Sequence, residues 1–176
     1  LHTSVLQAPD SPERLREAEA CLQESLQIAD RLVLEHPNVP DYAASKVHAL
    51  YRLAENFRRK RQPEAVERKL REALDVQLSS AGRFPEASPY QAWTAIVGES
   101  LAKQLVHRGQ LQEPQSLLEE SLAILNRLLD ENTQAGHLHD LLARSYTSLA
   151  EVLRRTGNDD AAAEAARLAQ MHRADS

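Results

Sequence analysis

The sequence predicts an all-α fold: an α-solenoid of about seven helices, stacked as antiparallel helix pairs. Three observations support this prediction. The 176 residues include only five glycines and 4% aromatic residues, and the abundant Ala, Leu, Glu, Arg and Gln favour helices over strands. Apolar residues recur at helical spacing. The whole pattern also repeats every 48 residues, as expected of a repeat architecture.

Two independent sets of residues carry this period. The first set holds Leu22, Glu24, Ser25 and Leu26, which recur as Leu70, Glu72, Ala73 and Leu74 and again as Leu118, Glu120, Ser121 and Leu122. The second set holds Leu53 and Ala54, Leu101 and Ala102, and Leu149 and Ala150, continued by Phe57, Leu105 and Leu153 and by Gly109 and Gly157. Two independent sets of residues would rarely share the same 48-residue period by chance.

The first three helices are bounded by prolines. Ser11 is a suitable N-cap and Pro12 a suitable first helical residue, so a helix is expected over about 12–35. The stretch 36–40 contains two prolines and ends it. A second helix is expected over about 41–61, and Pro63 opens a third that continues to about residue 80.

The next four helices repeat these signals. Ser88 and Pro89 begin a helix that runs to about residue 108, where Gly109 supplies a left-handed C-cap. Helices are expected over about 112–131 and 138–156, the latter ended by Gly157. Asn158 then caps a final helix, which we interpret as a terminal cap of the array.

Each unit is therefore a helix, a short turn, a longer second helix and a loop. We expect an irregular or truncated segment at 1–11 and one repeat domain over 12–173, with units of about 12–40 (partial), 41–88, 89–137 and 138–173. One helical hairpin leaves an apolar face uncovered, so neighbouring hairpins must stack to bury a continuous core. The small residues Ala54, Ala102 and Ala150 permit close helix approach.

Composition excludes several classes of protein. A net charge of -5 and a pI near 5.8 argue against nucleic-acid binding, which needs a positive excess. Cys21 is the single cysteine, so neither an intramolecular disulfide nor a thiolate zinc cluster is possible within one chain. No apolar run is long enough to span a bilayer, and no signal segment follows Leu1. We expect a cytoplasmic fragment of a longer protein, without membrane insertion.

The helical pattern resembles the tetratricopeptide repeat. The resemblance lies in Leu53, Ala54, Phe57, Val66, Leu70 and Ala73, in Leu101, Ala102, Leu105, Gly109, Pro114, Leu118 and Ser121, and in Tyr146, Leu149, Ala150, Leu153, Gly157 and Ala162. The period is 48 residues instead of about 34, the second helices are extended, and Pro114 stands where Ala is typical. This long variant is similar to repeats attached to planctomycete regulatory proteins such as serine/threonine kinases and sigma-factor-related proteins.

The resemblance implies that the first helix of each unit lines a concave, partner-binding groove. The residues carried over by register are His48, Tyr51, Arg52, Glu55, Arg59, Glu99, Lys103, His107, Arg144, Thr147, Ser148, Glu151 and Arg155. Arg59, His107 and Arg155 would form a basic ladder suited to an acidic segment. Alternatively, these groups only complement helix C-termini.

No catalytic motif is present, so the sequence predicts neither an enzyme nor a cofactor or metal site. His137, His139 and Asp140 are interpreted as surface residues and Cys21 as a small buried one. Trp93 and Tyr90 are interpreted as core residues packed on the preceding loop, or else as partner anchors. We expect a protein- or peptide-binding scaffold of a larger bacterial regulatory protein, or alternatively a structural self-association domain that forms homo-oligomers.

Overall fold

The computed structural model describes residues 11–81, 83, 88–131 and 136–176, with only the backbone described at residues 81 and 88–90. Its helices are α1 (Pro12–Glu35), α2 (Pro40–Arg59), α3 (Pro63–Ala81), α4 (Ser88–His107), α5 (Pro114–Glu131), α6 (Gly136–Arg155) and α7 (Asp159–Ala174). All seven predicted helices are confirmed, and the described residues contain no strand. The predicted segment at 1–11 lies almost wholly outside the described residues.

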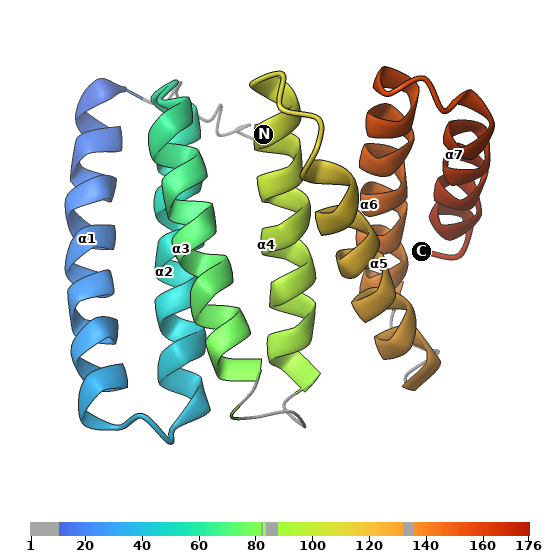
Figure 1. Cartoon of the computed structure of the whole chain (residues 1–176). Helices are drawn as coiled ribbons and strands as arrows, with labels where there is room; N and C mark the ends of the chain where they lie inside the picture. The colour runs from blue at the N-terminus through green and yellow to red at the C-terminus, as the bar shows by residue number, and fades with distance from the viewer. Residues whose placement is uncertain (1–10, 82, 84–87, 132–135) are drawn as a thin grey trace, which may run out of the picture.

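The helices form an open row with α1 and α7 at opposite ends (Figure 1). Each helix packs against the next one in the chain, and α4 also contacts α6. The row confirms the predicted solenoid of antiparallel pairs. None of the described helices combines the length and apolar character that crossing a membrane requires.

The prediction of a longer second helix in each unit is wrong. The first helices α2, α4 and α6 have 20 residues each, whereas α3, α5 and α7 have 19, 18 and 16. The 48-residue period therefore extends both members of a pair. The first helices are long because the signals that end them come late in each unit.

Those helix ends share one C-cap structure. In each, the N–H three residues beyond the last helical residue bonds back to a carbonyl in the last turn: Gln62 to Phe57 at 3.0 Å, Gln110 to Leu105 at 2.9 Å and Asn158 to Leu153 at 2.8 Å. The residue before each donor has a positive φ: 56° at Arg61, 78° at Gly109 and 82° at Gly157. This is the Schellman arrangement, and the predicted glycine cap at residue 109 is confirmed.

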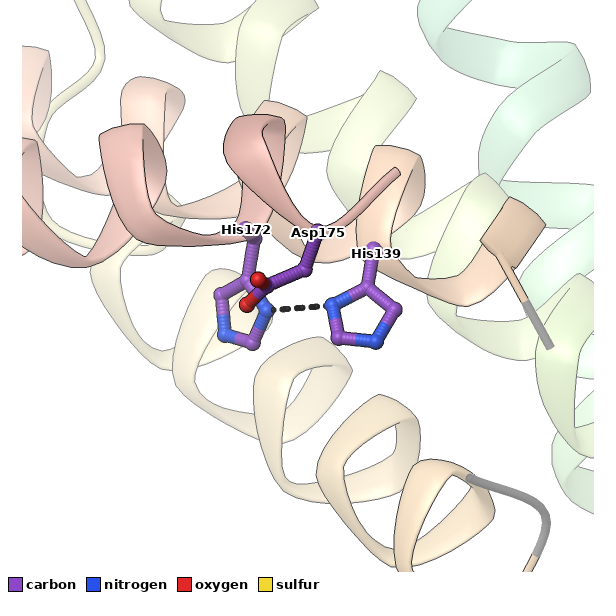
Figure 2. Close-up of side chains that lie close together, drawn as sticks. All are labelled: His139, His172 and Asp175. Carbon is purple, nitrogen blue, oxygen red and sulfur yellow. Dashed lines mark hydrogen bonds between the residues drawn. The ribbon is translucent and has the colours of Figure 1, made fainter. Parts of the chain in front are cut away.

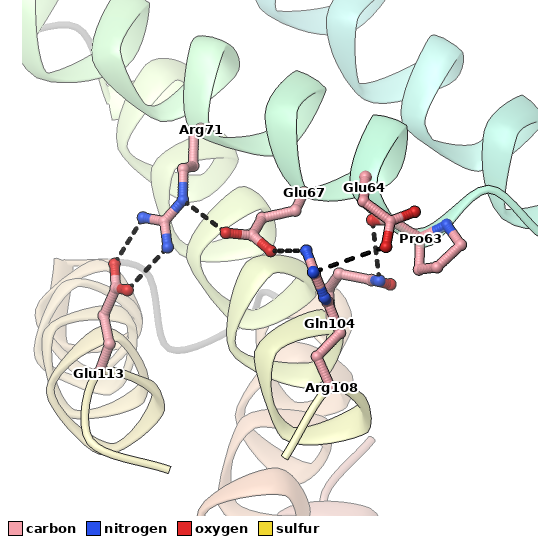
Figure 3. A network of polar contacts seen from close by, with 7 residues as sticks. All are labelled: Pro63, Glu64, Glu67, Arg71, Gln104, Arg108 and Glu113. Carbon is pink, nitrogen blue, oxygen red and sulfur yellow. Dashed lines mark hydrogen bonds and ion pairs between the residues drawn. The ribbon is translucent and has the colours of Figure 1, made fainter. Parts of the chain in front are cut away.

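Polar contacts between units also recur with the 48-residue step. The Gln104 amide donates to the Pro63 carbonyl at 3.1 Å, and the Asn56 amide donates to the Leu15 carbonyl at 3.2 Å. Likewise Arg108 pairs with Glu67 at 2.6 Å, as Lys60 pairs with Glu19. Figure 3 shows the later set. Each contact joins the end of a first helix to the start of the preceding second helix.

The core runs along the row without interruption. Leu50, Leu53, Leu70, Leu101, Leu105, Leu118 and Leu142 are among its fully buried side chains. The small residues Ala54, Ala102 and Ala150 are exposed by only 0%, 0% and 3%. Their burial agrees with the predicted close approach of helices.

The prediction that Cys21 is buried is wrong, because its side chain is exposed. The reason lies in the place of α1 at the end of the row. Among the described helices, α1 packs chiefly against α2, so the side of α1 that faces away from α2 is not covered by another described helix. Ile28 and Leu34, exposed by 45% and 82%, lie on the same helix.

Candidate functional site

A basic groove lies along the first helices of the units, α2, α4 and α6. It is a hollow of about 730 Å³ whose ionisable lining consists of Glu55, Arg58, Arg61, Glu99, Lys103, His107 and Arg144, with Tyr51, Pro63, Ser100 and Gln104 between them. Four of these side chains carry a permanent positive charge and two carry a negative one. This local excess is opposite in sign to the net charge of the chain, -5.

Glu99 forms the floor of the basic groove. Its side chain is only 3% exposed, yet it accepts hydrogen bonds from Arg144 at 2.9 Å and Ser148 at 3.3 Å and pairs with Lys103 at 2.8 Å. A buried carboxylate is tolerated because several donors surround it. Lys103 and Arg144 are each 49% exposed, so both cations are also accessible to a ligand in the groove.

An aromatic cluster lies in a second hollow, of about 530 Å³, where α1, α2 and α4 meet. The Trp93 ring meets His48 edge-on at 5.4 Å and 82°, and Tyr51 at 5.6 Å and 71°. Trp93 is half-buried. Because both of these ring contacts are with residues of α2, Trp93 packs on α2 in this cluster. The side chain of Tyr90 lies outside the described residues.

Ten of the thirteen predicted groove residues line a described hollow. Tyr51, Glu55, Glu99, Lys103, His107 and Arg144 line the basic groove, and His48 and Arg52 line the second hollow. A small third hollow of about 70 Å³ adds Ser148 and Glu151 and shares Lys103 and His107 with the groove. Lys103 and His107 therefore lie where the two hollows adjoin.

The remaining three predicted residues lie outside these hollows. Arg155 donates to the Val106 carbonyl at 3.0 Å, at the end of α4, and Thr147 accepts from Arg173 at 2.9 Å. Arg59 is exposed near the end of α2. Of the basic ladder, only His107 lines the groove. Arg155 instead donates to one carbonyl at the C-terminus of α4, a contact of the kind that the alternative interpretation describes.

The register positions taken over from the resemblance leave out part of the lining. The groove is also lined at the ends of α2 and α4 by Arg58 and Arg61, which lie beside the predicted ladder in the sequence, and by Gln104. The signal was present, since Arg58 and Arg61 belong to the basic run that ends α2.

A second polar site joins α6 and α7. The Nδ1 atoms of His139 and His172 lie 3.0 Å apart, and Asp175 lies close to both. Burial and the neighbouring His139 hold the pKa of His172 below its usual value, while Asp175 opposes the shift. His137 and Asp140, which the sequence grouped with His139, are exposed and outside this site. His172, distant in sequence, could not be assigned to it.

Comparisons with known proteins find distant likenesses among solved structures. No family model and no curated protein matches the sequence. Among solved structures, a putative kinesin light chain from Podosopora anserina with nearly identical TPR-like repeats is 18% identical, with a TM-score of 0.38 and 92% of both chains covered. BtubC (BKLC) from P. vanneervenii is 15% identical, with a TM-score of 0.33 and 91% of both chains covered.

MamA is 11% identical, with a TM-score of 0.33, and the match covers 93% of this chain and 95% of that one. At these values the likenesses assign no function.

Proposed function

We propose that the chain is a non-enzymatic scaffold that binds an acidic segment of a protein or peptide in the basic groove. The observation that supports this proposal most directly is the cationic lining of that groove in an otherwise acidic chain. Lys103 and Arg144 are half-exposed while anchored to buried Glu99, so both are held in place before a ligand arrives. Such preorganisation lowers the cost of ordering side chains on binding.

Calorimetric titration with a Glu-rich peptide tests this function. The unmodified chain should bind it, more weakly as salt rises, and should bind a Lys-rich peptide much less. The double variant Arg58→Gln with Arg61→Gly removes two groove cations and should lower the affinity about tenfold, since an exposed charge contributes under about 1 kcal/mol.

The matched control is the double variant Arg16→Gln with Arg68→Gln. It removes the same charge from exposed positions on α1 and α3, outside the basic groove. Its affinity should stay near that of the unmodified chain. An equal loss in both double variants, or tighter binding of the Lys-rich peptide, would remove the groove from the account. Arg59→Glu with Arg155→Glu tests the remaining ladder positions in the same titration.

Self-association is the second candidate function, and exposed apolar side chains favour it. Ile28 and Leu34 on α1 are 45% and 82% exposed, and Leu78 on α3 is 56% exposed. Burying such side chains between two copies would stabilise a dimer. Light scattering should then show a dimer that Leu34→Glu converts to a monomer. A monomer at every accessible concentration would argue against this candidate.

We also propose that the scaffold is part of a larger bacterial regulatory protein, on the strength of the sequence resemblance described above. The domain that accompanies it in the full-length gene would specify what the bound segment regulates. A gene that encodes no further domain would contradict this context.

A further inference from the structure

The histidine site lies where the first turn of α6 meets the last turn of α7. His139 is in that first turn, His172 is in that last turn, and Asp175 is the C-cap residue of α7. Because the two helices are antiparallel, these positions come to one end of the pair. Figure 2 shows the three side chains converging there. One nitrogen from each ring and one carboxylate oxygen all lie within 4.8 Å of one another.

Packing fixes the ring of His172. The side chain is 9% exposed and stacks on Tyr146, with 5.7 Å between ring centroids and 6° between planes. The Tyr146 hydroxyl in turn accepts a hydrogen bond from Asn126 at 3.4 Å. A ligand that is already held by its neighbours loses little conformational freedom when it binds an ion.

The two nitrogens are spaced as ligands of one ion. Two nitrogens at about 2.0–2.1 Å from one ion lie about 2.9 Å apart at a right angle and about 3.4 Å apart at a tetrahedral angle. The Nδ1 atoms of His139 and His172 are 3.0 Å apart. This spacing is within a few tenths of an ångström of both geometries, so binding an ion requires the two lone pairs to turn from each other toward a shared point but little change in their distance.

The chemistry of the donors selects the class of ion. A hydrogen bond between the two facing Nδ1 atoms needs one of them to carry the proton and the other to offer its lone pair. Both lone pairs become available to an ion once that proton is released or is carried on Nε2 of the same ring. Two imidazoles suit zinc, nickel or copper far better than magnesium or calcium, and Asp175 adds a negative charge.

We propose that His139, His172 and Asp175 bind one divalent transition-metal ion of the zinc class, which clamps the end of α7 to the start of α6. Three protein ligands leave a coordination position for water or for a side chain of a partner. The site does not depend on the basic groove. It would add a metal-dependent contact between the last helix and the rest of the row.

Calorimetry with Zn²⁺ alone tests the site on the full chain, without an affinity tag and after treatment with a chelator. The proposal predicts one ion per chain, a melting temperature that rises with Zn²⁺, and no comparable effect of Mg²⁺. His139→Gln should weaken binding by about 100-fold or more, because it removes a direct ligand. Asp175→Asn, at the exposed end of α7, should weaken binding without disturbing the fold.

His137→Gln is the matched control, because it removes an exposed histidine two residues from His139 that is outside the cluster. It should bind Zn²⁺ as the unmodified chain does. NMR of the histidine rings gives a second measurement, in which Zn²⁺ should shift His139 and His172 but not His137. No binding by the unmodified chain, undiminished binding by His139→Gln, or a loss in His137→Gln would overturn the proposal.

Discussion

Arg61 has a left-handed backbone at the position where the next two units have glycine. Its φ is 56°, against 78° at Gly109 and 82° at Gly157. A side chain with a Cβ atom pays about 1–2 kcal/mol in this conformation. The same residue lines the basic groove, so under the proposed function its charge would account for a locally unfavourable residue.

Arg61→Gly should therefore raise the free energy of unfolding by about 0.5–1 kcal/mol, because relief of the backbone exceeds the added freedom of the unfolded chain. Urea denaturation measures this change. Arg61→Ala is the control, since it removes the guanidinium but keeps a Cβ atom in the left-handed region, and it should not be stabilised. Equal gains in both variants would show that the charge, and not the backbone, is responsible.

At the scale of helix pairs, Gly98 permits the close approach of α4 and α5. A Cβ atom on Gly98 would lie 2.6 Å from the Ser121 hydroxyl oxygen. That hydroxyl is held in a hydrogen bond of 2.7 Å to the Leu117 carbonyl. The contact leaves no room for a methyl group unless one of the helices or the serine moves.

Gly98→Ala should lower the free energy of unfolding by about 1–3 kcal/mol through overpacking, as measured by urea denaturation. Adding Ser121→Ala should recover much of this loss, because it removes the oxygen that the new methyl group meets and places at residue 121 the alanine found 48 positions earlier. A double variant as unstable as Gly98→Ala would mean that the backbones, and not the serine, limit the approach.

An ion pair links α3 to the start of α5. Arg71 donates two hydrogen bonds of 2.8 Å to Glu113 and one of 3.0 Å to Glu67 (Figure 3). The Arg71 guanidinium holds the pKa of the Glu113 carboxyl below its usual value. The unfolded chain therefore binds the proton more readily, so the stabilisation is present above the unfolded pKa and is lost as pH falls through the folded one.

Glu113→Gln should accordingly flatten the decline of stability in that acidic range, by less than about 1 kcal/mol because the pair is well exposed. Urea denaturation from about pH 7 down to about pH 3 measures the effect. Glu120→Gln, an exposed acidic residue of α5, is the control and should leave the profile unchanged. A steeper decline of stability with falling pH in Glu113→Gln would contradict the assigned direction of the Glu113 pKa shift.

For the whole molecule, the sequence predicted the row of helices well because the signals are local and repeated. Caps such as Ser11 and Gly109 and the 48-residue register determine helix ends without knowledge of the rest of the chain. Pairings between distant residues were less accessible. The contact of His139 with His172 depends on two helix ends meeting, and the exposure of Cys21 depends on which side of α1 is covered.

The basic groove was predicted only in part for the same reason. The register identified Glu99, Lys103 and Arg144 as facing one surface, but it carried no information on their mutual contacts. The burial of Glu99 follows from the packing of α4 against α6, which no local pattern encodes. The residue types of a surface were thus predictable, whereas the network among them required the fold.

The most direct test of the proposed function is to map where an acidic segment binds. Amide chemical shifts of the isotopically labelled chain, followed while a Glu-rich peptide is added, report contacts along every helix. We expect changes on α2, α4 and α6, largest around Glu99, Lys103 and Arg144. Changes centred on α1, α3, α5 or α7, or none at saturating peptide, would contradict it.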